Sequence, residues 1–207
     1  MEYMTKIFAK LLILLALFST LGPSISHAET PDIVVQKFQQ NLLAVMKDAK
    51  QLSVRQRYQR LEPSVVQAFH LPLMTRISTG AFWKTATKEQ RKQLIQAFRR
   101  MSISTLATLF KSYSGERFKS LGEQPGPRQL RLVKTEMTRP KKDAVPITYI
   151  TKKFRNQWYL IDVIVANGIS ELKVRRSEYR GVLKSEGIQG LIKILNKKAD
   201  ELIKSSK

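Results

Sequence analysis

Apolar and polar positions along the chain follow first a helical period, then a strand period, then a helical period again. Residues 30–32 are Thr-Pro-Asp. Thr is a common N-cap, Pro is favoured at the first helical position, and an acid is favoured in the first turn, so the three indicate the start of a helix. A helix is therefore predicted from there to about Lys47. Residues 53–82 predict short helical segments that are interrupted at Pro63 and Pro72.

The longest predicted helix begins after Thr87, where Gln90 stands three residues on as the partner of a capping box. At 100° per residue its apolar positions share one broad face. These positions are Leu94, Ile95, Phe98, Met101, Leu106, Leu109 and Tyr113. Such a face either packs into an ordinary core or lines a cavity, and periodicity does not separate the two.

The middle of the chain has the pattern of β-strands. Three runs rich in β-branched and aromatic residues cover 129–138, 145–154 and 158–165, and 117–121 is a candidate fourth strand. The polar segment 155–157 between the last two runs is typical of a hairpin turn. An antiparallel sheet is therefore predicted.

The C-terminal part returns to a helical period. Its apolar positions, spaced three and four residues apart, are Ile188, Leu191, Ile192, Leu195, Ala199, Leu202 and Ile203. Lysines occupy the opposite face, which favours a helix packed on the sheet and leaves a membrane-surface helix as the alternative. Without repeats or linkers, residues 29–207 are interpreted as one α+β domain.

The N-terminal segment, residues 1–28, has the organisation of a secretory signal peptide. Lys6 and Lys10 precede the apolar stretch 11–21, which is shorter than the roughly 20 residues of a membrane span. Ser-His-Ala at 26–28 is a small-x-small cleavage site. The prediction is an exported protein that is cleaved after Ala28.

Charge and cysteine content narrow the classes further. The chain has 207 residues, 37 Lys and Arg against 16 Asp and Glu, a net charge of +21, and no cysteine. The missing thiol excludes a disulfide scaffold, a zinc–thiolate site and a cysteine nucleophile. Export and the absence of a recognition motif argue against nucleic acid. Because the basic residues are spread along the chain, they indicate either a solubilising surface or attraction to anionic membranes or an acidic partner.

Candidate catalytic residues are few. After residue 28 the chain has one histidine, His70, beside Pro72 in an apolar stretch, and a structural role is the simpler interpretation. Asp162 lies inside an apolar strand, where a basic partner or backbone donors usually satisfy a carboxylate. No metal-ligand spacing and no phosphate-binding glycine motif is present. We therefore predict no enzyme, no metal and no cofactor.

Several motifs, in order, resemble the MlaC (toluene-tolerance, Ttg2-type) family. The first is Gly-Ala-Phe-Trp-Lys-Thr-Ala-Thr at 80–87, which continues through 89–91 and 97–99. The second joins segments at 158–163, 168–170, 179–180 and 187–192. The likeness covers roughly residues 32–200. Asn167 departs from the usual acid of the family, and 170–179 is closer to the hopanoid-associated HpnM branch.

The resemblance implies a periplasmic lipid carrier. Its cargo would be phospholipid, or else a hopanoid. Its partners would be an inner-membrane ABC transporter with a substrate-binding component and an outer-membrane lipoprotein–porin complex. The implied fold is α+β, a curved antiparallel sheet of about four strands covered by helices, NTF2-like in outline, enclosing an apolar cavity for acyl chains.

The candidate lining of that cavity is the set of large apolar residues on the predicted helical and strand faces. They are Phe69, Leu73, Ile77, Phe82, Trp83, Phe98, Met101, Leu109, Val133, Met137, Ile147, Tyr149, Trp158, Leu160 and Val163. Each would serve equally as core. Two other functions stay open: an adaptor with a filled core that docks partners or anionic membrane through its basic surface, and a hydrolase using His70.

Overall fold

The computed structural model describes residues 29–166 and 168–204, so the predicted signal peptide lies outside the described residues. The helices are α2 (Pro31–Asp48), α3 (Val54–Ala68), α4 (Leu71–Thr79), α5 (Phe82–Thr85), α6 (Lys88–Leu109), α7 (Glu171–Ser185) and α8 (Gly187–Lys204). The strands are β1 (Arg117–Pro125), β2 (Arg131–Arg139), β3 (Lys142–Phe154), β4 (Gln157–Val165) and β5 (Ile169–Ser170). Short 3₁₀ turns, η1 (Ala49–Gln51) and η2 (Pro127–Gln129), complete the order. The predicted α+β class is confirmed.

Side chains cap the helices at the predicted places. The Thr30 hydroxyl accepts a hydrogen bond from the Ile33 amide at the start of α2. Thr87 and Gln90 form the predicted capping box at the start of α6, in which each side chain accepts from the other residue's amide. A cap of this kind contributes about 1 kcal/mol to helix stability, so these starts are encoded locally.

Two helix boundaries differ from the prediction. Pro63 lies inside α3 and does not interrupt it. Because Leu61 and Val65 on either side of it are buried, packing outweighs the one backbone hydrogen bond that the proline removes. Helix α6 ends at Leu109, so Tyr113 is not part of its apolar face. Pro72, by contrast, stands in the first turn of α4, as a proline at a helix start does.

The strands form one open antiparallel sheet in the order β1-β2-β3-β4-β5. The predicted β3–β4 hairpin is confirmed, with Phe154 opposite Gln157. The candidate strand at 117–121 is real and extends to Pro125. The two-residue strand β5 and the helix α7 were not predicted from the sequence. Five strands therefore replace the expected four.

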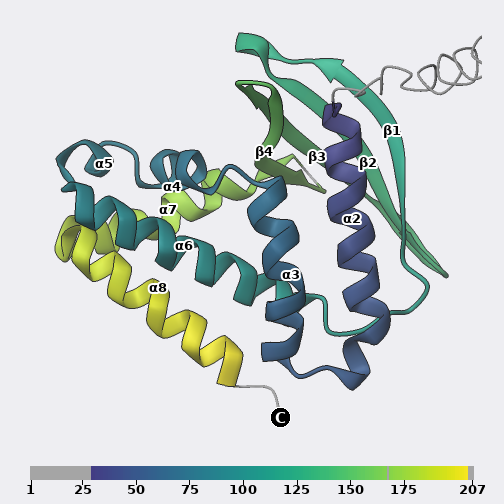
Figure 1. The fold of residues 1–207 in the computed structure, drawn as a ribbon, viewed down its shortest axis with the longest axis horizontal. Coiled ribbons are helices and arrows are strands. Elements are labelled where there is room, and N and C mark those ends of the chain that lie inside the picture. The colour runs from purple at the N-terminus through teal and green to yellow at the C-terminus, as the bar shows by residue number, and fades with distance from the viewer. Residues whose placement is uncertain (1–28, 167, 205–207) are drawn as a thin grey trace, which may run out of the picture.

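The register of the sheet defines one face that points toward the helices. Val133 pairs with Tyr149, and Tyr149 pairs with Val163, so these three side chains share a face. Helix α2 lies across this face, which we call the inner face of the sheet (Figure 1). The Phe38 ring contacts the Tyr149 ring edge-on, with 6.4 Å between centroids. The interface between α2 and the inner face is one part of the core.

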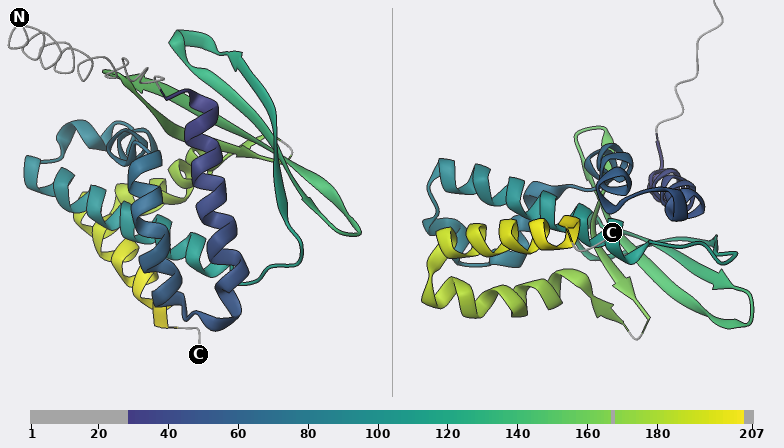
Figure 2. Two further views of the ribbon diagram at one scale, coloured as in Figure 1. Left: turned by 45° about the vertical axis from the view of Figure 1, so that its right-hand side comes forward. Right: turned by 90° about the horizontal axis from the view of Figure 1, so that it is seen from below.

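The other part of the core lies among helices beside the sheet. Helix α6 packs against α3 and α8, and α7 packs against α4 and α8 (Figure 2). Helix α3 joins the two parts because it touches both α2 and α6. One continuous cluster of buried apolar residues runs through both parts.

A buried arginine fastens α3 to its neighbours. The Arg57 side chain lies in the core with the residue 5% exposed, and its Nε donates to the carbonyl oxygen of Ala107 at 2.8 Å. Its Nη1 donates to the carbonyl oxygens of Ala49 at 3.0 Å and Leu52 at 2.5 Å. All three acceptors lie at or near the carboxyl ends of helical segments, where carbonyl groups lack partners and attract a cation.

We expect Arg57→Met to lower the free energy of unfolding by about 3 kcal/mol, because three buried carbonyl groups lose a charged donor. Urea denaturation followed by circular dichroism measures the change. The matched control is Arg60→Met on the same helix. Arg60 carries an ion pair with Asp48 and its side chain is 52% exposed, so a loss below about 1 kcal/mol is expected. Equal losses would refute the role assigned to Arg57.

Candidate functional site

The strand residues that were proposed as cavity lining do share one surface. Val133, Ile147, Tyr149 and Leu160 are buried on the inner face, and Met137, Trp158 and Val163 are half-buried there. Phe69 joins them from the end of α3, with its ring 4.9 Å from that of Phe38. The structure thus brings eight of the fifteen candidates together under α2 and α3.

The remaining candidates lie in or beside the helical part. Phe98 is buried and lies 5.7 Å from the Arg175 guanidinium of α7, and Trp83 lies 5.4 Å from that of Arg91. Phe82 and Met101 are also half-buried against the core. Leu73 is half-buried, whereas Ile77 is 36% and Leu109 is 69% exposed. The role of these residues in lipid binding stays a prediction.

The fully buried polar groups at the α2–sheet interface are neutral, and a carboxylate, that of Asp32, meets the sheet only where it is half-buried, at the Ser120 hydroxyl. The buried Gln39 amide on α2 donates from Nε2 to Thr135 Oγ1 at 3.1 Å and to the Tyr149 hydroxyl at 3.3 Å. Burial raises the pKa of Tyr149 to about 12, so this hydroxyl stays protonated at neutral pH. The buried middle of the inner face therefore combines apolar side chains with uncharged hydrogen-bonding groups, on which hydrocarbon can lie without desolvating a charge. Charged residues also lie on this face, because Arg131 pairs with Thr151 and Glu123 with Val133, and their side chains form an ion pair at 2.8 Å.

The enclosed cavity expected for acyl chains stays a prediction, and the hollow beside this interface is small. The hollow nearest the interface lies between α2 and α3, over Phe38 and Ala68, and measures about 20 Å³. A space of that size holds about one water molecule. Side chains such as Phe38, Phe69 and Tyr149 fill the volume between helix and sheet, as close packing in a protein interior dictates.

A second, larger hollow lies on the opposite, outer side of the sheet. It measures about 630 Å³, is open to solvent, and surrounds the β3–β4 turn. Its lining residues are His70, Phe154, Arg155, Asn156, Gln157 and Tyr159. No sequence pattern indicates this site, because its residues come from two segments that are far apart in the chain, His70 and 154–159.

His70 has a structural role in that wall. Its Nδ1 accepts a hydrogen bond from the Leu73 amide at 3.1 Å and so caps α4. Its ring lies 4.0 Å from that of Phe154 and 5.4 Å from that of Tyr159. Burial lowers the pKa of His70 below 6.5, and the nearby Lys152 acts in the same direction. The structural interpretation of this histidine is supported by the cap.

Asp162 also makes structural contacts. Its Oδ1 accepts from the amides of Val163 and Leu172, and its Oδ2 accepts from the Ser170 hydroxyl at 2.6 Å. The carboxylate thereby joins β4 to the start of α7, where a negative charge is stabilised by the helix end. Backbone donors and a hydroxyl, not an arginine, satisfy this acid.

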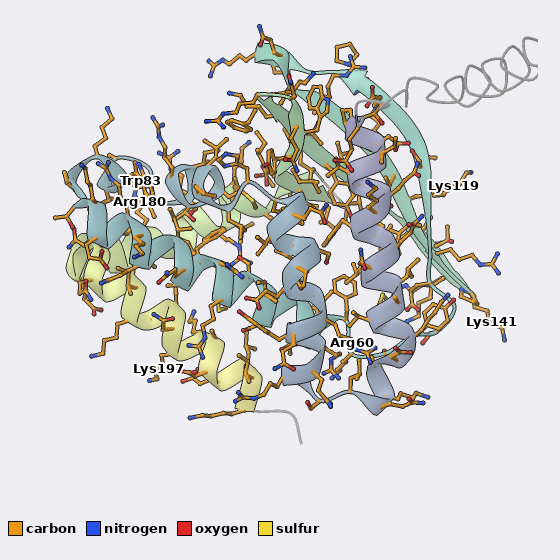
Figure 3. All side chains as sticks on the ribbon, viewed as in Figure 1. Arg60, Trp83, Lys119, Lys141, Arg180 and Lys197 are labelled. Carbon is orange, nitrogen blue, oxygen red and sulfur yellow. The ribbon has the colours of Figure 1, made fainter. Side chains whose placement is uncertain are left out.

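The described residues contain neither a candidate metal cluster nor a candidate membrane-spanning helix. Across 29–166 and 168–204, no three His, Asp or Glu side chains are grouped so that they could hold a metal ion. Of the helices described here, none has the length and apolar content needed to cross a bilayer. Basic side chains are distributed around the periphery, as Lys119, Lys141, Arg180 and Lys197 illustrate (Figure 3).

Comparison with known proteins identifies the fold and the family. A solved structure, that of the phospholipid-binding protein from Ralstonia solanacearum in complex with a phospholipid, is similar with a TM-score of 0.73 and 20% sequence identity. The alignment covers 84% of this chain and 99% of that one. No curated protein matches the chain by sequence. The sequence profile of the MlaC protein family matches residues 36–197, so the chain belongs to the MlaC family. The family resemblance drawn from the motifs is confirmed, and the HpnM branch stays a prediction.

The cap made by His70 predicts a pH dependence of stability. Neutral Nδ1 accepts the Leu73 amide, whereas protonated Nδ1 does not. Since the pKa of the folded state lies below the unfolded value near 6.5, the contribution is complete above that value. It is lost as pH falls through the lower pKa of the folded protein. We expect a loss of about 1 kcal/mol, measured by urea denaturation over a pH series.

The control for this prediction is His70→Asn, which keeps an acceptor at the cap but does not titrate. It should remain stable at neutral pH and lack the loss that the wild type shows on mild acidification. An identical pH profile in both proteins would rule out His70 as its source.

Proposed function

We propose that this protein is a periplasmic carrier that binds phospholipid and transfers it between membranes. The observation that carries the proposal is membership of the MlaC family over residues 36–197. The phospholipid bound to the Ralstonia protein of the same fold supports the choice of cargo. The signal-peptide pattern at 1–28 supports export. The domain would then comprise residues 29–207.

A carrier of this kind performs no chemical step. Each CH₂ group of an acyl chain costs about 0.8 kcal/mol in water, so a two-chain lipid does not cross an aqueous gap unaided at a useful rate. A protein that replaces water around the chains makes transfer an exchange between two apolar environments. The free energies of the lipid in the membrane and in the protein are nearly equal. The direction of transfer must therefore come from another process, for example from ATP hydrolysed by a transporter.

We place the acyl chains between α2 and the inner face of the sheet. The buried part of this interface is apolar and neutral, and its polar contacts are those of Gln39 with Thr135 and Tyr149. Near the start of α2, the Asp32 carboxylate accepts from the Ser120 hydroxyl of β1 at 2.7 Å. Because side chains fill the interface, α2 must move away from the sheet to admit hydrocarbon. The half-buried residues at its margin, such as Met137 and Phe118, are where entering chains would first make contact.

The remaining assignments rest on the family alone. The donor and acceptor would be an outer-membrane lipoprotein–porin complex and an inner-membrane ABC transporter with its substrate-binding component. Phospholipid is the first cargo, and a hopanoid is the second, suggested by the HpnM-like segment at 170–179. The headgroup would remain in water, where the net charge of +21 favours an anionic group.

An adaptor with a filled core is the second candidate. The packed interior favours it, since the space between α2 and α3 measures about 20 Å³. An adaptor would bind partners through its surface and would take up no lipid. Lipid loading therefore discriminates between the two functions.

We expect the protein, purified without detergent, to carry phospholipid in native mass spectrometry or to acquire it from vesicles. Met137→Arg should reduce loading at least about tenfold, because it sets a charge where acyl chains enter. As Met137 is half-buried, the variant should still fold, which circular dichroism checks.

Val174→Arg is the matched control. Val174 is 38% exposed on α7 and is not among the candidate lining residues, so the same change of charge should affect neither folding nor loading. A wild-type protein that holds no lipid and acquires none would support the adaptor. Equal loading by both variants would reject the proposed entry route.

A further inference from the structure

The hollow around the β3–β4 turn has an aromatic wall. Phe154 and Tyr159 lie across the hairpin from each other, with 6.1 Å between ring centroids. From the start of α4, the His70 ring lies at a 32° tilt against Phe154 and meets Tyr159 edge-on. The His70 cap and the hydrogen bond from the Tyr159 hydroxyl to Gln157 Oε1 at 2.8 Å hold two of these rings in place. The wall is therefore preorganised for an apolar group.

The sheet separates this hollow from the α2 interface. Tyr149 and Thr151 point to the inner face, so Lys152 and Phe154 point to the outer one, and Tyr159 lies opposite Lys152. At the strand edge the gap is closed, because the His70 amide donates to the Leu160 carbonyl at 2.9 Å. A lipid whose chains lie under α2 therefore does not place its headgroup in the hollow.

The rim of the hollow is positively charged. Lys152 lies 5.6 Å from the centre of the Phe154 ring, and Arg155 forms part of the lining. Among the described residues neither cation takes part in an ion pair. Asn156 in the turn adds amide hydrogen-bonding groups. Two unneutralised cations beside a fixed aromatic wall match a ligand that carries carboxylates next to an apolar side chain.

We infer that the hollow formed by His70, Phe154 and Tyr159, with Lys152 and Arg155 at its rim, is a docking site for an acidic segment of a partner protein. The fixed aromatic rings suit an inserted side chain, and the two cations beside them suit carboxylates on its neighbours. One aromatic or aliphatic residue of the partner packs on the His70 and Phe154 rings, and neighbouring carboxylates pair with the two cations. This inference goes beyond lipid carriage and does not depend on the cargo.

The test uses a fluorescein-labelled peptide, Gly-Asp-Glu-Phe-Asp-Glu-Gly, and the purified protein. Fluorescence anisotropy should show binding that weakens with added salt, and amide NMR signals should shift at residues 154–159. Arg155→Glu should weaken binding at least about tenfold, since a repulsive charge replaces an attractive one. His70→Asn, which keeps the α4 cap but removes a ring, should weaken it several-fold.

The matched control is Lys141→Glu. Lys141 and Arg155 are both exposed, both have positive φ (60° and 53°), and they occupy the turns at opposite ends of β3, so both variants change the net charge equally. Lys141→Glu should change affinity by less than about twofold if binding is local. Equal losses in the two charge variants, or no binding by the wild type, would overturn the inference.

A vesicle-binding experiment tests the alternative that this surface binds an anionic membrane and not a protein segment. If Arg155→Glu abolishes binding to vesicles containing phosphatidylglycerol but leaves peptide binding unchanged, the surface is a membrane site and the inference is wrong. Lipid loading of the wild type is measured in parallel. Since peptide binding does not require lipid, a wild type that binds the peptide but takes up no lipid refutes the carrier function and leaves the docking site intact.

Discussion

The structure depends on the packing of one helix, α2, against the inner face of an open sheet. An open sheet exposes a face of apolar side chains that must be covered, and α2 covers it with Val35, Phe38 and Leu42. The same contact is the proposed place for acyl chains. Under this proposal, stability and cargo binding would compete for one interface, and hydrocarbon would enter by replacing contacts that hold the protein together. Gln39 is the polar exception there, and its bonds to Thr135 and Tyr149 fix the position of the helix without introducing charge.

Charge is separated from this interface almost completely. The cations lie on the surface and are spread over sheet and helices, as Lys119 and Lys197 show (Figure 3). Two charged residues among those described are buried: Arg57 is compensated by three backbone carbonyl groups, and the Glu116 carboxylate accepts from the Ser114 amide. A charged exterior and a neutral interior suit a protein that meets anionic lipid headgroups outside and hydrocarbon inside. The outer hollow differs from both regions, because aromatic rings and unneutralised cations meet there.

Much of the architecture could be predicted because the signals are local. The capping residues Thr30 and Thr87, the strand pattern at 145–154 and the helical period at 188–203 depend on neighbours a few positions away. Pro63 was misleading, since burial of Leu61 and Val65 depends on elements far along the chain. Strand β5 could not be predicted, because two residues carry no periodicity. Its pairing with β4 is accompanied by a long-range contact, the hydrogen bond from the Ser170 hydroxyl to Asp162. The sequence could not predict whether a cavity exists, because a cavity is the difference between the volume that the elements enclose and the volume that their side chains fill. Both volumes depend on the tertiary structure.

The sequence by itself determined the family, the α+β class, the helix starts and the composition of the apolar faces, since each is written in contiguous residues or fixed spacings. Tertiary structure alone decided which faces meet. The register of the sheet places Val133, Tyr149 and Val163 together under α2. The chain passes the edge of β4 at His70, whose ring then lies on the outer face beside Phe154. A shift of one residue in pairing would exchange the two faces. That geometry is set by the sum of long-range contacts, which no local pattern contains.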